Sequence, residues 1–226
     1  METQEDQQTI NHENASQGLF QKIVSAYREH ILVHGTEPAS IYSFCKEIGI
    51  EESEFYEHFN DFDQVADAFW TAVFESVVDA TMKEGEYDSY SVRERFLTFY
   101  YNFFEELKKH RSYALLSFRD SLFSLRPDNS SLGKLKKEYK MWAKDLLYQA
   151  MNNNEVASRS KLSDTYDTLF WYQFLFLINF WRKDKSKGFE KTDAAVEKSV
   201  NLSFDLIEKN ALDSAFDFGK FMFQNR

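Results

Sequence analysis

The stretch GIEESEFYEHF, residues 49–59, decides how the N-terminal part of this chain folds. Gly49 is typical of a residue that ends a helix, and residues 52–59 predict a short helix after it. Before it, residues 40–48 predict a short helix capped by Ser40, and residues 19–33 predict a longer one ended by Gly35. Three helices of this size and turn chemistry are typical of a helix-turn-helix, although spacing alone favours an ordinary three-helix corner of a larger bundle.

Composition extends the helical prediction to the rest of the chain. The 226 residues include only 7 Gly and 2 Pro, too few for the many turns of a β-sandwich or barrel. We therefore expect an all-α fold of about nine or ten helices, each bounded by one of the few breakers. Beyond the N-terminal helices, the expected segments are residues 63–83, 91–109, 112–122, 132–151, 169–181, 192–209 and 211–223.

The net charge of −10 is confined to one part of the chain. Residues 1–66 hold three basic residues against thirteen acidic ones, whereas the remaining residues are balanced. This asymmetry marks a boundary near residue 66. As a whole-chain value, an acidic balance argues against nucleic acid as a partner.

The run from Ile23 to Val65 resembles, without a gap, the DNA-binding domain of TetR-family transcriptional regulators. The motif positions are Ile23, Ala26, Gly35, Ser40, Phe44, Cys45, Ile48, Gly49, Ile50, Tyr56, Glu57, His58, Phe59, Asp63 and Val65. The resemblance implies a dimeric, all-helical regulator in which a small apolar molecule bound by the helical domain controls binding to operator DNA. It implies a helix-turn-helix domain at 18–66 and a helical ligand-binding and dimerisation domain at 67–226. The acidic, Gln- and Asn-rich composition of residues 1–17 predicts a disordered tail before them.

Carried over position by position, the resemblance implies four DNA contacts. Ser40 would cap its helix and contact a phosphate, Ser53 would lie near the start of the reading helix, and Tyr56 and His58 would contact the DNA backbone. The chain departs from the family where a phosphate-contacting Lys follows the Tyr-x-His-Phe motif, because Phe62 stands there. Residues 51–63 also contain six acids and no base, which opposes phosphate binding.

Aromatic residues make up 17% of the chain and predict an apolar ligand pocket between helices. For each of them singly, an ordinary place in the core is the favoured alternative. Gln173 differs because a polar group on an apolar helix needs a hydrogen-bonding partner. The candidate pocket residues are Phe96, Tyr100, Phe103, Tyr113, Phe118, Trp142, Tyr172, Gln173 and Phe176.

Residues 169–181, LFWYQFLFLINFW, form the most apolar segment. Thirteen residues are too few to cross a bilayer, which needs about 20, so no membrane partner is expected. A helix that is apolar on nearly all sides needs more than one neighbour to cover it. We expect a homodimer formed through residues 164–183 and 192–209.

The sequence gives little indication of a catalytic, cofactor or metal site. A lone Cys45 permits no internal disulfide, and neither a phosphate-binding glycine loop nor a catalytic triad pattern is apparent, so we expect no enzyme and no cofactor. His30 and His34 have metal-ligand spacing, but the sequence shows no third ligand, so no metal is expected. The absence of a signal peptide pattern and the cysteine usage predict a cytoplasmic location.

Two functions follow from these observations. The first is a dimeric TetR-like regulator that binds an operator and an apolar ligand. The second is a relative of that fold that has lost DNA binding and acts as a ligand-binding or protein-interaction module. The intact motif supports the first, and the acidic reading helix supports the second.

Overall fold

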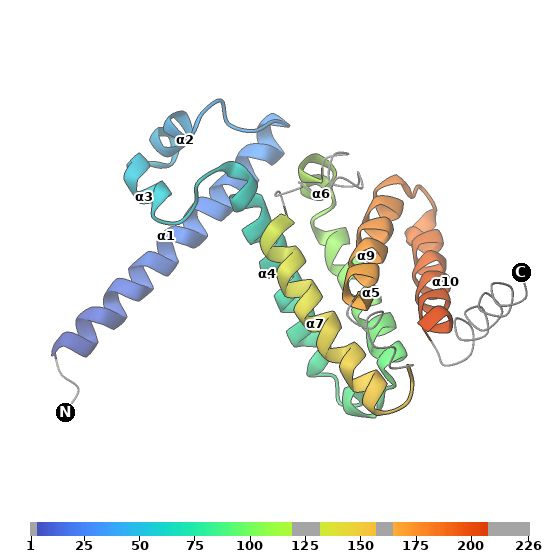
Figure 1. Ribbon diagram of the computed structural model, residues 1–226. Coiled ribbons are helices and arrows are strands. Elements are labelled where there is room, and N and C mark those ends of the chain that lie inside the picture. Colours follow the sequence, from blue (N-terminus) through green and yellow to red (C-terminus); the bar gives the residue numbers. More distant parts are fainter. Residues whose placement is uncertain (1–3, 119–131, 157–164, 208–226) are drawn as a thin grey trace, which may run out of the picture. The chain divides into compact units, whose positions relative to one another are not determined.

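The computed structural model describes residues 4–118, 132–156 and 165–207, and within these ranges the chain is helical and contains no strand (Figure 1). This confirms the predicted all-α class. The chain divides into two compact units, one made of residues 1–72 and 110–135 and the other of residues 73–109 and 136–226. Helix α4 (Phe62–Met82) contributes residues to both.

The first unit is built on the long helix α1 (Gln4–His34), which is followed by α2 (Ile41–Ile48), α3 (Glu52–Tyr56) and, later in the chain, α6 (Arg111–Ser117). Helix α1 begins well before the predicted start at residue 19. Residues 4–17, which we expected to form a disordered tail, are therefore helical in the structure. The segment is rich in Gln and Glu, which are good helix formers, and it lacks Pro.

The turn between α2 and α3 has the local chemistry that the sequence predicted. The Ser40 hydroxyl accepts from the backbone N–H of Ser43 at 3.1 Å, while the Ser43 hydroxyl accepts from the backbone N–H of Ser40 at 3.2 Å. At the other end of α2, Gly49 adopts a left-handed conformation, φ 67° and ψ 51°, which favours glycine because it has no Cβ. The two caps limit α2 to eight residues and turn the chain into α3.

Aromatic rings hold this helix-turn-helix together. Phe44 of α2 and Phe55 of α3 are fully buried and lie edge to face at 6.3 Å between ring centroids. Phe62, at the start of α4, stacks on Tyr27 of α1 at 5.1 Å and contacts both buried rings. Buried Phe rings of this size supply much of the energy that holds α2, α3 and the start of α4 against α1.

The second unit is a helical domain with an aromatic core. After the C-terminal part of α4, it contains η1 (Tyr87–Ser89), α5 (Val92–Lys109), α7 (Gly133–Asn152), α9 (Tyr166–Lys183), η4 (Lys187–Phe189) and α10 (Glu190–Ile207). Helix α10 packs against both α5 and α9 (Figure 1). The first residues of α7, up to 135, belong to the other unit.

The helix limits agree with the sequence prediction within a few residues for α2, α4, α5, α7, α9 and α10. Gly188 has φ 64° and ends the turn before α10, as its position suggested. The predicted helix at 211–223 and the last residues of the predicted 112–122 helix lie outside the described residues. No helix among the described residues is both long and apolar enough to span a membrane.

Candidate functional site

The four predicted DNA contacts lie on or beside α2 and α3. Ser53 and Tyr56 are exposed on α3, and the Tyr56 side chain keeps 51% of its surface open to solvent. Ser40 is exposed at the start of α2, although its hydroxyl is already engaged in the cap. His58 is half-buried and packs edge to face on Phe20 of α1 at 6.0 Å, so it contributes to packing between α1 and the end of α3.

The acids of α3 differ in their roles. The Glu54 carboxylate accepts from the backbone N–H of Glu51 at 2.8 Å and so stabilises the start of the helix. Glu51, Glu52 and Glu57 are exposed and leave three carboxylates on the helix that would approach DNA. The surface of α3 therefore displays negative charge where a phosphate-binding surface needs positive charge.

Phe62 explains why the phosphate-contacting Lys of the family pattern is missing. Its ring stacks on Tyr27 and lies edge to face with Phe44 and Phe55, so this position belongs to the core of the module. A Lys side chain here would have to direct its ammonium group away from three aromatic rings. At this position the chain therefore has apolar packing where the family pattern has a phosphate contact.

A buried carboxylate in the same unit has a structural role. Asp67 of α4 accepts from the backbone N–H groups of Lys134 at 2.6 Å and Leu135 at 2.9 Å, and so caps the start of α7. The Thr71 hydroxyl donates a longer bond of 3.4 Å to the same carboxylate. Burial raises the pKa of Asp67 despite these hydrogen bonds, because removing the carboxylate from water disfavours its charge.

The predicted pocket residues do not form one group. Tyr113 and Phe118 belong to the first unit, where both stack on Trp70, with ring centroids at 5.5 Å and 4.4 Å. Beside them is a cavity of about 270 Å³, to which Trp70 and the polar side chains of Glu37 and Asp63 contribute. These two aromatic residues therefore pack in the unit that contains the helix-turn-helix.

Four other members of the predicted set pack in the core of the helical domain. Phe96, Tyr100 and Phe103 have no exposed surface, and Trp142 lies against Phe96 at 5.0 Å. The Tyr139 hydroxyl donates to the backbone carbonyl of Phe170 at 3.1 Å, so Tyr100 donates to Tyr139 across a distance of 2.6 Å. Burial raises the pKa of both phenols, so they stay neutral hydrogen-bonding groups.

The last three members lie on α9. Tyr172 and Phe176 are exposed, with 44% and 53% of their surfaces open to solvent, whereas Gln173 is buried at 8%. The Gln173 amide donates to the Ser199 hydroxyl of α10 at 3.1 Å, which is the partner that its polar group required. Among the described residues, its carbonyl oxygen has no hydrogen-bonding partner.

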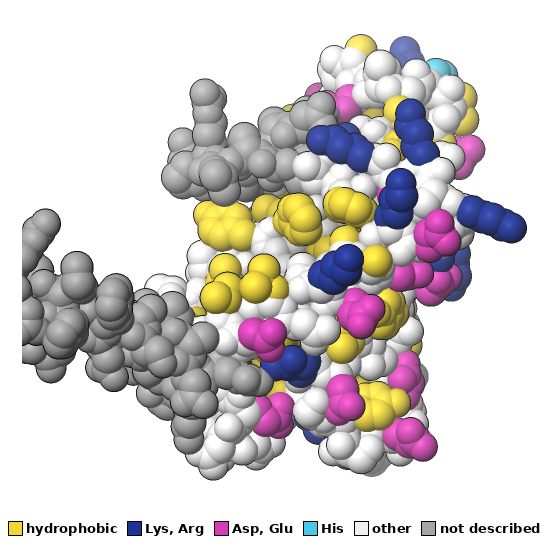
Figure 2. All heavy atoms as spheres, turned by 90° about the vertical axis from the view of Figure 1, so that its right-hand side faces the viewer, with side chains coloured by type: hydrophobic (Ala, Val, Ile, Leu, Met, Phe, Trp, Pro, Cys, Tyr) yellow, Lys and Arg dark blue, Asp and Glu magenta, His cyan; other side chains and the backbone are white. Residues whose placement is uncertain are grey.

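Helices α9 and α10 expose an apolar face, which we call the α9/α10 face. Its large hydrophobic residues are Leu169, Tyr172 and Phe176 of α9 and Leu202 and Leu206 of α10, each at least 42% exposed. Figure 2 shows hydrophobic side chains gathered on this side of the molecule, with charged side chains around them. A row of this kind on two neighbouring helices is typical of an interaction surface.

The connection between α9 and α10 is rigidified by a second buried acid. Asp184 accepts hydrogen bonds from the backbone N–H and the hydroxyl of Ser186 and from the same two groups of Thr192, at 2.7–3.0 Å. Burial alone would raise the pKa of Asp184, but these four donors lower it to about 2. Next to this turn, a groove of about 510 Å³ is lined by Phe176, Phe180 and three lysines.

A helix-turn-helix followed by a helical domain with an exposed two-helix face defines the class of all-α transcription regulators. The family described as "Tetracyclin repressor-like, C-terminal domain" matches residues 95–222, which is more than half of the chain. The chain belongs to this TetR-type family of regulators, as the N-terminal motif suggested.

Solved structures share this fold. A proposed TetR-family transcription regulator from Shewanella sp. PV-4 has a TM-score of 0.57 and 14% identity, with 85% of this chain and 99% of that chain covered. The fatty acid degradation regulator FadR from Bacillus halodurans has a TM-score of 0.56 and 16% identity, with coverage of 82% and 97%. A Rhodococcus sp. RHA1 protein of unknown function has a TM-score of 0.53 and 12% identity, with coverage of 84% and 96%. No curated protein matches the sequence.

Sequence reasoning missed several residues that matter for these sites. Asp67 and Asp184 are ordinary acids in the sequence; the fold brings Asp67 to the start of a helix 67 residues further along, and Asp184 bonds the start of α10 eight residues away. Glu47 is likewise one of many acids, but the structure places it against His30. The exposure of Leu202 and Leu206 could have been predicted from the sequence. Their spacing of four on an amphipathic helix puts them on the face opposite the buried Val200 and Phe204.

Proposed function

We propose that this protein is a homodimeric regulator that reads operator DNA with α2 and α3 and responds to a small apolar ligand in its helical domain. The observation that carries the proposal is the exposed α9/α10 face, in a chain whose N-terminal module keeps a complete helix-turn-helix. The α9/α10 face lies within the two segments that the sequence predicted for dimer contacts.

The dimer is supported by the energy that this face would gain from burial. Removing one fully exposed large apolar side chain from water contributes about 1.5–3 kcal/mol, and each of the five side chains of the face, which are 42–60% exposed, would gain about half of that. Because a twofold interface uses the same surface on both chains, each side chain counts twice. The total gain of about 7–15 kcal/mol is of the size needed to offset the loss of rotational and translational freedom on association, which costs roughly 4–15 kcal/mol.

DNA binding by α3 is supported by its exposed Ser53 and Tyr56, and it is opposed by the exposed acids Glu51, Glu52 and Glu57. A carboxylate about 4–8 Å from a phosphate costs on the order of 0.5–1 kcal/mol even at the dielectric constant of water. One Glu in a reading helix is compatible with recognition, because a carboxylate can accept from cytosine N4. We therefore propose that α3 reads bases while its exposed acids reduce, but do not abolish, the attraction of the module to phosphates.

The acidic surface favours a second function, in which the former DNA-reading module is a protein-interaction module. Such a module would bind a partner with a basic surface, and the helical domain would keep its roles in dimerisation and ligand binding. The exposed carboxylates of α3 are the specific observation that favours this alternative. Neither function requires catalysis by the chain.

We propose a small apolar ligand because the core of the helical domain consists largely of aromatic side chains. Phe96, Tyr100 and Phe103 are fully buried, so a ligand would have to enter by separating rings that now touch. Native mass spectrometry of the purified protein tests this idea, since a bound apolar molecule adds its mass to the folded protein. We expect such a species, and a folded protein with no added mass and no stabilisation by apolar compounds argues against it.

Titration against random-sequence duplex DNA at low salt separates the two functions. The operator-binding function predicts steeply salt-dependent binding, with a dissociation constant below about 10⁻⁴ M. The absence of binding in that range favours the interaction module. Light scattering on the same sample tests the dimer: we expect twice the chain mass of 26.8 kDa at micromolar concentration, and a monomeric mass would refute it.

A further inference from the structure

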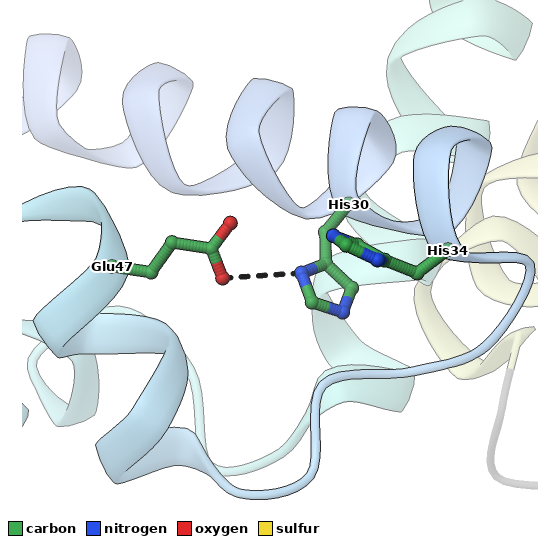
Figure 3. Close-up of side chains that lie close together, drawn as sticks. All are labelled: His30, His34 and Glu47. Atoms are coloured by element: carbon green, nitrogen blue, oxygen red, sulfur yellow. Dashed lines mark hydrogen bonds and ion pairs between the residues drawn. The ribbon is translucent and has the colours of Figure 1, made fainter.

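Three side chains with metal-binding atoms meet inside the helix-turn-helix module. His30 and His34 lie four residues apart at the end of α1, and Glu47 approaches them from the last turn of α2 (Figure 3). The Nδ1 atom of His30 is 3.2 Å from Oε2 of Glu47, and the two imidazole rings are 4.3 Å apart between centroids. One ligand atom of each residue lies within 4.8 Å of the others.

The donor set and its dimensions fit a divalent transition metal. Two imidazole nitrogens and one carboxylate oxygen are a common protein ligand set for zinc, and two histidines four apart on a helix present their rings on one face. Ligand atoms that are each about 2.0–2.1 Å from a tetrahedral ion lie about 3.3 Å from one another. The separation of His30 and Glu47, 3.2 Å, already matches such an edge, so only the His34 ring has to rotate inward.

The surroundings leave an entry path and an open coordination position. The His30 side chain is 14% exposed and therefore held in place, whereas His34 and Glu47 face solvent. Within the described residues, the side chains of His34 and Glu47 have no hydrogen bond outside this group, so an ion would not have to displace another structural partner. A water molecule would complete the coordination from the solvent side.

We propose that His30, His34 and Glu47 bind a divalent transition-metal ion of the zinc class, which fastens α2 to α1. The sequence predicted no metal, because His30 and His34 lacked a third ligand; the fold supplies Glu47. Binding would change the local charge by two units in the most acidic part of the chain and would fix the helix that precedes α3. The proposal concerns metal binding alone and does not depend on whether the module binds DNA.

Calorimetric titration of zinc into the chelator-treated full-length protein tests the site. We expect one ion per chain, an affinity on the order of micromolar or tighter, and a higher melting temperature with the ion bound. Cobalt titration provides a second readout, because tetrahedral coordination gives visible absorption bands that loose surface binding does not.

Two variants and one control make the assignment specific. His34→Ala and Glu47→Gln each remove one ligand from an exposed position, so both variants should fold, and each should weaken zinc binding at least about tenfold. His12→Ala removes a histidine of the same helix, away from the cluster, and should leave zinc affinity unchanged. Circular dichroism confirms that the variants keep their helical content.

The proposal is overturned by any of three results. One is the absence of saturable zinc binding to the wild-type protein at about 100 µM, well above the expected dissociation constant. Another is zinc binding whose affinity does not change in His34→Ala and Glu47→Gln. The third is an equal loss in His12→Ala, which would show that the histidines bind zinc without a defined site.

Discussion

The exposed surfaces of α3 and α9 differ in chemistry, although similar side chains anchor the two helices. Phe55 beneath α3 and Phe170 beneath α9 are both fully buried among other aromatic rings. On the outside, α3 displays carboxylates, whereas α9 displays Leu169, Tyr172 and Phe176. The buried residues specify the fold, but the exposed residues determine the partner: an apolar face gains by association, and an acidic helix is repelled by a polyanion.

The largest expected effect is on dimerisation through the apolar α9/α10 face. Phe176→Asp places a charge on the α9/α10 face, and in a symmetric dimer the change acts twice. Because Phe176 is 53% exposed, losing the burial of two such side chains costs about 1.5–3 kcal/mol, and the two carboxylates placed in the apolar face add to this, so the dimer should weaken at least about tenfold. Sedimentation equilibrium of the variant measures this change.

Met141→Asp is the matched control, because Met141 lies on α7 and is also 53% exposed. The control should remain a dimer. If Met141→Asp dissociates the protein as strongly as Phe176→Asp does, the α9/α10 face is not the interface.

The next effect distinguishes a buried acid of α4 from an exposed acid of the same helix. Asp67→Ala removes the acceptor of the part-buried backbone N–H of Lys134 and of the buried backbone N–H of Leu135. Leaving the buried donor without a partner lowers the free energy of unfolding by about 1–3 kcal/mol. Urea denaturation measures the loss, and Asp79→Ala, which removes an exposed acid of the same helix α4, should change stability by less than about 0.5 kcal/mol. Equal effects of the two changes would contradict the capping role.

The smallest effect is a pH dependence in the helical domain. The pKa of Asp184 is lowered to about 2 from its ordinary 3.8, because four hydrogen bonds outweigh its burial. A lowered pKa means that ionised Asp184 stabilises the folded state above pH 3.8, and that this stabilisation is lost as the pH falls toward 2. Wild-type protein should therefore be more stable than Asp184→Asn at pH 5, and denaturation at pH 5, 4 and 3 should show the difference shrinking. A difference that grows on acidification would contradict this assignment.

Much of the fold could be predicted from the sequence because its signals are local. Ser40 and Gly49 bracket α2 with a cap and a left-handed turn, and the fourfold spacing of Ile23, Tyr27 and Ile31 marks the buried side of α1. The predicted start of α1, at residue 19, was wrong. Residues 4–17 have no apolar periodicity, and helical propensity alone is a weak signal.

The sites were less predictable, because they depend on contacts between distant residues. Tyr113 and Phe118 are aromatic like Phe96 and Phe103, but the chain path puts the first pair with Trp70 and the second pair with Trp142 and Phe174. Composition alone cannot separate two such clusters. Nothing in the sequence distinguishes Glu47 from the other acids of its segment. Only the packing of α2 against α1 brings it to His30.

We propose that the module keeps the fold of a DNA reader and that the acids of α3 limit its affinity for DNA. The most direct test compares the wild-type protein with Glu51→Gln/Glu52→Gln/Glu57→Gln, using fluorescence anisotropy of labelled duplex DNA at about 50 mM salt. Removing three carboxylates relieves about 1.5–3 kcal/mol of repulsion per reading head, so the variant should bind about ten- to a hundredfold more tightly. If neither protein binds DNA below about 10⁻⁴ M, α3 does not read DNA and the claim is wrong.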